Sequence, residues 1–233
     1  MKVCGVQGVS IIDYPGRIAS VLFLGGCNFR CPFCQNPDLV LRPESLPGLD
    51  LEETMRSIEK KKGFVDGVVV TGGEPLIHGE ALLSLLRRLR EAGLAVKLDT
   101  NGYEVELLHE VLTAELVDYV AMDVKTSLAG YSEAAGRELD TRRIEQSIRL
   151  IMDSGVQYEF RTTCVPGIVE EDDIRGIAAL ISGAKRYYLQ QFRPDGPVID
   201  AAYEAVRPYD AATLGRFLSL VSPSVEACGL RGA

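Results

Sequence analysis

The sequence predicts an α/β fold in which six strands, each followed by a helix, form a parallel sheet that curves into a partial, TIM-like (βα)6 barrel. Short runs rich in Val, Ile, Leu, Phe and Tyr alternate with segments whose apolar residues recur at helical spacing. Near-continuous apolar runs are typical of strands covered on both faces, and helices between them imply parallel strands. A complete barrel of eight units takes about 250 residues, so six units in 233 residues indicate an open barrel. A doubly wound open sheet is the structural alternative.

The expected elements follow one another along the whole chain. Strands are expected at residues 18–24, 67–71, 94–99, 117–123, 156–163 and 186–192. Apolar residues at helical spacing cover 51–58, 82–89, 144–151, 174–181 and 214–221, with a weaker pattern at 105–114. Asp50 with Glu53 resembles a capping box at the start of the first helix, and Gly63, Gly93 and Gly155 are expected to end helices. We expect a single domain over residues 1–233, with a core of about 16–222.

The composition excludes several classes of protein. With 46% hydrophobic residues and six cysteines, the chain is too apolar for a disordered protein and too poor in cysteine for a small disulfide scaffold. The net charge of −8 argues against direct nucleic-acid binding. The longest uncharged run, between Arg17 and Arg30, is shorter than the ~20 apolar residues that cross a membrane, and the N-terminus lacks a signal-peptide cleavage site. We therefore expect a cytoplasmic protein without membrane contacts, whose thiols are reduced or bound to metal.

Polar or glycine-rich residues follow each predicted strand. The six segments are Gly-Gly-Cys-Asn-Phe-Arg-Cys-Pro-Phe-Cys-Gln-Asn from Gly25, Thr-Gly-Gly-Glu-Pro from Thr71, Asp-Thr-Asn-Gly from Asp99, Asp-Val-Lys from Asp123, Arg-Thr-Thr from Arg161 and Gln-Gln-Phe-Arg-Pro from Gln190. Ligands of parallel α/β folds bind at the carboxyl ends of the strands. These segments together predict one binding site at that end of the sheet.

Three of the cysteines, Cys27, Cys31 and Cys34, lie within eight positions in a C-x3-C-x2-C pattern. Three close thiolates suit an iron–sulfur cluster with one iron left open. A structural zinc site normally has four protein ligands, so zinc would need His78, His109 or a distant cysteine as the fourth. A disulfide would leave an odd thiol. The spacing favours the cluster over zinc, and the other cysteines are expected to be structural thiols: Cys4, Cys164 and Cys228.

The C-x3-C-x-aromatic-C loop after the first strand, with Gly-Gly-Glu-Pro after the second, resembles the radical S-adenosylmethionine (SAM) superfamily. The segments Asp-Tyr-Pro-Gly at 13–16, Asp-Thr-Asn-Gly and Asp-x-Lys resemble more narrowly the glycyl-radical-enzyme activating enzymes, above all the short anaerobic ribonucleoside-triphosphate reductase activating proteins. The resemblance covers essentially the whole chain. It implies a radical SAM core with a [4Fe–4S] cluster on Cys27, Cys31 and Cys34, whose open iron is chelated by SAM. Reductive cleavage of SAM then yields methionine and a 5′-deoxyadenosyl radical, which removes hydrogen from a glycine of a partner enzyme.

The resemblance also implies which residues contact the cofactor. They are Phe33, Gln35, Gly72, Gly73, Glu74, Asp99, Asp123, Lys125, Arg161 and Gln191. The two glycines, assisted by Glu74, are expected to bind the methionine amino group. Asp123 and Lys125 lie two apart on one face of a strand end, where they can bind the ammonium and carboxylate of a methionyl moiety. Arg161 is expected either to contact the carboxylate or to pair with an acid. Asp99, Thr100 and Asp123 could hold a monovalent cation, and a hydrogen-bonded turn without metal is the alternative.

The implied partners are a glycyl-radical enzyme, of the anaerobic ribonucleotide reductase or pyruvate formate-lyase type, and an electron donor of the flavodoxin or ferredoxin type. An outside donor is expected because the chain has no second cysteine cluster. Two alternative functions stay open at this point. One is a radical SAM enzyme that modifies a small molecule or peptide, such as a deazapurine-forming enzyme, and the other is a non-enzymatic zinc-binding or redox-sensing domain.

Overall fold

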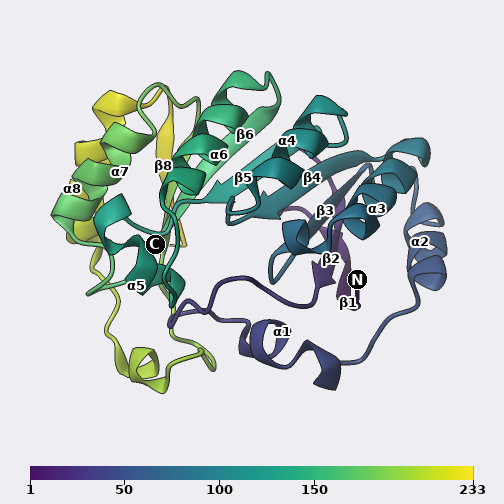
Figure 1. The fold of residues 1–233 in the computed structure, drawn as a ribbon, viewed down its shortest axis with the longest axis horizontal. Coiled ribbons are helices and arrows are strands. Elements are labelled where there is room, and N and C mark those ends of the chain that lie inside the picture. Colours follow the sequence, from purple (N-terminus) through teal and green to yellow (C-terminus); the bar gives the residue numbers. More distant parts are fainter. Residues whose placement is uncertain (233) are drawn as a thin grey trace. The chain divides into compact units, whose positions relative to one another are not determined.

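The structure is a computed structural model, and it describes residues 1–232 (Figure 1). The strands are β1 Val3–Ser10, β2 Ala19–Leu24, β3 Gly67–Gly72, β4 Ala95–Thr100, β5 Tyr119–Asp123, β6 Gln157–Cys164, β7 Tyr187–Gln191 and β8 Cys228–Arg231. The α-helices are α1 Pro37–Leu41, α2 Leu51–Glu59, α3 Glu80–Glu91, α4 Val105–Thr113, α5 Tyr131–Ala135, α6 Arg142–Asp153, α7 Glu171–Leu180 and α8 Ala211–Val221. Short 3-10 helices cover Pro43–Ser45, Pro75–His78, Leu128–Gly130, Ala201–Ala205 and Ser222–Ser224. The strand order in the sheet follows the chain, from β1 to β8.

The chain forms two compact units. The first unit comprises Met1–Asn28, Asp38–Thr100 and Glu106–Val120. The second unit comprises Phe29–Pro37, Asn101–Val105 and the chain from Ala121 onward. Cys27 therefore belongs to the first unit, whereas Cys31 and Cys34 belong to the second.

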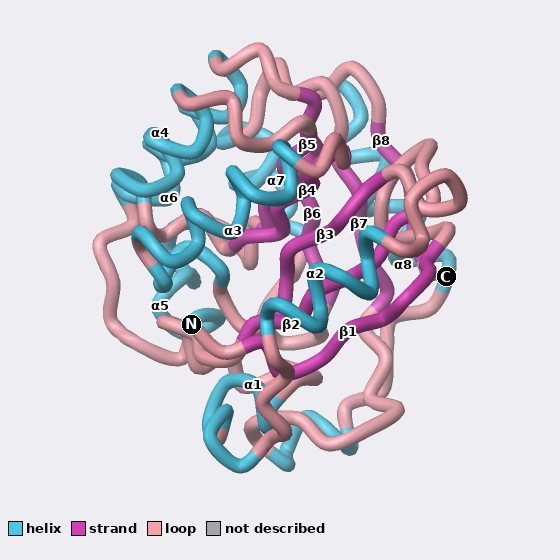
Figure 2. The backbone as a smooth tube through the Cα atoms, turned by 90° about the vertical axis from the view of Figure 1, so that its right-hand side faces the viewer, coloured by secondary structure: helices cyan, strands magenta, loops and turns pink. Residues whose placement is uncertain are grey.

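In the first unit, β2, β3 and β4 are parallel, and β1 runs antiparallel to β2. Figure 2 shows these strands as magenta segments of the backbone. The side chains of Val21 and Leu22 in β2 and of Val68, Val69 and Val70 in β3 are at most 2% exposed. This burial explains the near-continuous apolar runs, because both faces of these strands are covered. Helix α3 packs against β4, and α2 packs against β1.

Helix α2 begins at a residue that the sequence identified. The carboxylate of Asp50 accepts a hydrogen bond from the backbone N–H of Glu53 at 2.8 Å, which satisfies one of the otherwise unpaired donors of the first turn. Strand β1, in contrast, was not predicted. Its sequence includes Gly5, Gln7 and Gly8 and lacks a strong apolar alternation, so its strand conformation depends on pairing with β2.

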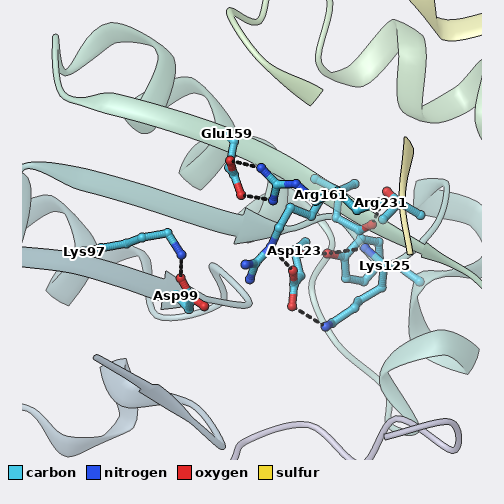
Figure 3. A network of polar contacts seen from close by, with 10 residues as sticks. Lys97, Asp99, Asp123, Lys125, Glu159, Arg161 and Arg231 are labelled. Atoms are coloured by element: carbon cyan, nitrogen blue, oxygen red, sulfur yellow. Dashed lines mark hydrogen bonds and ion pairs between the residues drawn. The ribbon is translucent and has the colours of Figure 1, made fainter. Parts of the chain in front are cut away.

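In the second unit, β6, β7 and β8 are parallel, with Phe160 opposite Tyr187 and Leu189 opposite Leu230. Helix α8 packs against β7, β8 and α7. Strand β8 was also not predicted, because its four residues carry no apolar run. Arg231 of β8 binds the carboxylate of Glu159 on β6 through two nitrogens, at 2.6 and 2.8 Å (Figure 3).

Gly215 lies in the interior of α8, where a Cβ atom would meet no other heavy atom within 4 Å. Glycine in a helix interior costs about 1 kcal/mol relative to alanine, because its backbone loses more freedom on folding. We therefore expect Gly215→Ala to raise the free energy of unfolding by about 0.5–1 kcal/mol. Urea denaturation of the metal-free protein, followed by circular dichroism, measures this change, and a lower midpoint for the variant would contradict the described environment of α8.

None of the helices within residues 1–232 combines the length and hydrophobicity needed to cross a membrane.

Candidate active site

In the first unit, the Gly-Gly-Glu segment after β3 lies against the start of the cysteine loop after β2. The N–H of Gly73 donates to the carbonyl of Leu24 at 2.9 Å, and the N–H of Glu74 donates to the carbonyl of Gly26 at 2.8 Å. The N–H of Gly26 donates to the carbonyl of Leu39 at 2.7 Å. Backbone hydrogen bonds on both sides therefore hold the residue that directly precedes Cys27.

Gly72 and Gly73 are required by the chain's own backbone. A Cβ atom on Gly73 would lie 1.9 Å from the carbonyl oxygen of Gly26. Gly72 has φ +125°, and a Cβ atom there would lie 2.3 Å from the backbone nitrogen of Leu24. From the sequence, we expected these glycines to bind the methionine amino group of the cofactor. The structure adds a second reason, which is that β2 and β3 approach each other too closely at their ends for any side chain.

A Cβ atom at position 73 would collide with the carbonyl oxygen of Gly26. We therefore expect Gly73→Ala to lower the free energy of unfolding of the metal-free protein by about 1–3 kcal/mol, as other overpacking substitutions do. Gly196→Ala is the matched control, since a Cβ atom at Gly196 would meet nothing within 4 Å. Chemical denaturation of both variants measures the difference. Equal stability of the two variants would show that the segment after β3 can move away from Gly26.

Glu74 joins the ends of two neighbouring strands. Its side chain is fully buried, and its Oε1 atom accepts hydrogen bonds from the N–H of Leu76 at 3.0 Å and from the hydroxyl of Thr100 at 2.7 Å. Thr100 is the last residue of β4. The sequence predicted that Glu74 assists in binding the cofactor, which stays a prediction. The structure shows that this carboxylate ties the segment after β3 to the end of β4.

Lys97 is a charged residue of this region that we did not single out from the sequence. It is 2% exposed within β4, and its ammonium forms an ion pair with Asp99, one of the predicted site residues (Figure 3). It also lies 6.0 Å from the ring centroid of Tyr119. The signal was present in the sequence, because a single lysine inside an apolar strand needs a partner for its charge. The pairing gives Asp99 an internal counter-charge.

In the second unit, Cys31 and Cys34 are held in one tight turn, in which the N–H of Cys34 donates to the carbonyl of Cys31 at 3.0 Å. Cys31 is buried, and this burial raises the pKa of its thiol to about 11. Phe33, between them, is buried and packs against Tyr203 with ring centroids 6.3 Å apart. Gln35, at the end of the turn, donates a hydrogen bond to the carbonyl of Arg193.

Within residues 1–232, none of the six cysteines forms a disulfide bond. Cys164 is fully buried, and burial raises the pKa of its thiol to about 12, as expected of an unreactive structural cysteine.

Within residues 1–232, no three His, Cys, Asp or Glu side chains are grouped closely enough to hold one metal ion. A [4Fe–4S] cluster differs from a single ion because its thiolate ligands bind different irons.

Asp123 at the end of β5 lies between two cations of the same unit. Its Oδ1 atom is 2.9 Å from Nε of Arg161 on β6, and its Oδ2 atom is 3.0 Å from Nζ of Lys125 (Figure 3). Burial alone would raise the pKa of the Asp123 carboxyl, but the charges of Arg161 and Lys125 hold it well below its usual range. Asp123 and Lys125 thus lie together as the sequence predicted, and Arg161 pairs with an acid. Together they present two positive charges and one negative charge.

Gln191, at the end of β7, donates from its Nε2 atom to the carbonyl of Tyr209 at 2.8 Å. Its Oε1 atom is buried and, within residues 1–232, has no hydrogen-bond partner. The residue borders an open groove of about 330 Å³ that Arg193 and Tyr209 also line. A buried acceptor without a donor is costly, so this oxygen suits a ligand that brings an N–H group.

A comparison with protein families identifies the superfamily of the chain. Residues 21–180 match the model of the radical SAM superfamily, which covers more than half of the chain. The chain belongs to the radical SAM superfamily. Members of this superfamily use a [4Fe–4S] cluster and SAM, so these two predicted cofactors are confirmed, as is the prediction of an enzyme.

Within the superfamily, the chain is similar to activating enzymes. It is 38% identical over 196 residues to a putative glycyl-radical enzyme activating enzyme of Methanocaldococcus jannaschii, covering 82% of this chain and 80% of that protein. It is 28% identical over 190 residues to a pyruvate formate-lyase-activating enzyme of Clostridium pasteurianum, covering 79% of this chain and 77% of that protein. The resemblance to glycyl-radical-enzyme activating enzymes that we stated from the motifs is thereby confirmed.

Solved structures agree on the fold. Streptococcus suis SuiB, in a crystal structure bound to S-adenosylmethionine, matches 91% of this chain with a TM-score of 0.66 and 17% sequence identity. The chain spans about half of that protein, 52% of its length. The predicted fold class, a partial TIM-like barrel with a parallel sheet and a radical SAM core, is confirmed. The roles of the individual site residues and the extent of the domain stay predictions.

Proposed function

We propose that the protein activates a glycyl-radical enzyme by removing a hydrogen atom from a glycine of that partner. The observation that carries this proposal is the similarity over four-fifths of the chain to a putative activating enzyme, together with the Asp123–Lys125–Arg161 group at the strand ends. The partner is an enzyme of the anaerobic ribonucleotide reductase or pyruvate formate-lyase type.

Cys27, Cys31 and Cys34 would hold the cluster. Their chemistry fits, since thiolates are the ligands that iron–sulfur clusters take, and these three cysteines are not tied up in disulfide bonds. When bound, the reduced cluster supplies the electron that splits SAM into methionine and a 5′-deoxyadenosyl radical. The chain's own residues hold the ligands in place, because backbone hydrogen bonds fix Gly26 before the first cysteine and close the turn between the other two.

The residues around the strand ends would bind SAM. The two cations at Lys125 and Arg161 fit the carboxylate of its methionine part, and Asp123 fits the ammonium. The buried Oε1 of Gln191 fits a donor such as the adenine amino group. The remaining proposed contacts are Phe33, Gln35, Gly72, Gly73, Glu74 and Asp99. Asp99, Thr100 and Asp123 are also the proposed ligands of a monovalent cation.

We also propose that a one-electron donor of the flavodoxin or ferredoxin type reduces the cluster, because the sequence contains no second group of closely spaced cysteines. The proposed setting is cytoplasmic and anaerobic, because a cluster with an open iron is sensitive to oxygen.

Electron paramagnetic resonance tests the proposal. The reconstituted protein, incubated anaerobically with SAM, a reductant and each of the two candidate partners, is expected to produce the doublet of a glycyl radical with one of them. The matched control is the same partner with its radical glycine replaced by alanine, which should give no doublet. Cleavage of SAM without a doublet on either partner, combined with multiple turnovers on a small compound, would instead assign the enzyme to small-molecule chemistry.

A further inference from the structure

Helix α5 contacts the strand end that carries Asp123 and Lys125. Its first residue, Tyr131, is fully buried. The hydroxyl of Tyr131 donates a hydrogen bond to the carbonyl of Asp123 at 3.4 Å and accepts one from the N–H of Lys125 at 3.3 Å. A single buried hydroxyl therefore joins the backbone on both sides of Val124, which fixes the direction in which the two charged side chains leave the chain.

The other end of α5 contacts the cysteine loop. The carbonyl of Ala135, the last residue of the helix, accepts a hydrogen bond from the N–H of Arg30 at 2.8 Å, and Arg30 directly precedes Cys31. Gly136 follows with φ +66°, and a Cβ atom there would lie 2.1 Å from the carbonyl oxygen of Arg30. The backbone of the cysteine loop thus lies directly on the end of the helix, where no side chain fits.

We propose that Tyr131 and Gly136 are positioning residues that fix Cys31 and Cys34 relative to Asp123 and Lys125 through the short helix α5 between them. This inference rests on the proposed roles of these four residues in holding the cluster and SAM. All of the contacts lie within the second unit. Neither residue touches the cofactors in the proposal, and both act through the backbone segments that they hold.

The first test compares Gly136→Ala with Gly155→Ala. Both glycines have positive φ, +66° and +78°, and follow helices, but a Cβ atom at Gly155 would meet nothing within 4 Å. The two variants therefore share the backbone strain and differ in the collision with Arg30. We expect release of iron from the reconstituted protein to a chelator to become roughly ten-fold faster in Gly136→Ala than in Gly155→Ala, as for other residues that orient metal ligands. Equal rates would overturn the role of Gly136.

The second test compares Tyr131→Phe with Tyr158→Phe. It can be carried out even if one of the glycine variants does not fold. Tyr158 is also buried, and its hydroxyl accepts a hydrogen bond from the N–H of Lys185 at 3.0 Å, away from the proposed site. Each change removes only a hydroxyl. We expect Tyr131→Phe to keep its iron content and to bind SAM about five-fold more weakly once reconstituted. Tyr158→Phe should bind SAM as the unchanged protein does. Isothermal titration calorimetry with SAM measures both affinities.

A spectroscopic readout separates positioning from general destabilisation. The change in the electron paramagnetic resonance spectrum of the reduced cluster on adding SAM is expected to be altered in Tyr131→Phe and unaltered in Tyr158→Phe. Identical spectra and affinities in the two tyrosine variants would overturn the role of Tyr131. None of these measurements uses a partner enzyme. A failure to produce a glycyl radical therefore leaves this inference standing, and its own failure leaves the activating function standing.

Discussion

Cys27→Ala is expected to abolish the cluster and all reductive cleavage of SAM. Three thiolates are the whole protein contribution to the proposed cluster, so the loss of one leaves a second iron without a protein ligand. The variant should still fold, because the preceding Gly26 is held by backbone hydrogen bonds that do not involve the cysteine side chain. Iron and sulfide content after anaerobic reconstitution, and 5′-deoxyadenosine formed with a chemical reductant, measure the two losses.

Cys228→Ala is the matched control for this experiment. Cys228 is a half-buried free thiol at the start of β8 and lies outside the cysteine loop. The Cys228→Ala variant should keep its full iron content and its full rate of SAM cleavage. A complete cluster in Cys27→Ala would refute the ligand assignment, and the same would follow if Cys228→Ala lost its iron.

Asp123→Asn is expected to keep the cluster and to weaken SAM binding by a factor of about 100, since the proposed partner of the SAM ammonium loses its charge. Arg161 and Lys125, whose side chains are 13% and 19% exposed, would also lose their counter-charge. We therefore expect the free energy of unfolding to fall by roughly 2 kcal/mol, less than for a fully buried pair. Titration with SAM measures the first effect, and urea denaturation of the metal-free protein measures the second.

The stability effect should depend on pH in a defined direction. The pKa of Asp123 is held well below its usual range in the folded protein, so folding favours the charged form. Its contribution is fully present above the ordinary carboxyl pKa of about 4 and is lost as the pH falls toward the depressed folded value. The difference in unfolding free energy between the unchanged protein and Asp123→Asn should therefore be constant near neutral pH and shrink below pH ~4.

An exposed ion pair provides the control for both effects. Asp38 pairs with Arg42 at 2.7 Å, and the two side chains are 51% and 73% exposed. Because solvent screens such pairs, Asp38→Asn should change the free energy of unfolding by less than about 1 kcal/mol at neutral pH. A loss as large as that of Asp123→Asn would mean that burial does not strengthen the Asp123 pairs.

Much of the fold was readable from the sequence because the responsible signals are local. The apolar runs placed six strands to within about two residues at each end. The Asp50 cap was confirmed as well, since it involves residues three positions apart. The cysteine spacing and the Gly-Gly-Glu segment identified the superfamily for the same reason, as each is a short, continuous stretch of chain.

The tertiary structure alone decided what these residues contact. It paired Asp123 with Arg161, 38 positions apart, and Glu74 with Thr100, 26 positions apart. It made strands of β1 and β8, whose sequences carry no strong pattern of their own. The physical reason is that burial and pairing across distant segments depend on which strand ends meet, whereas caps, apolar periodicity and ligand spacing are properties of neighbours in the chain.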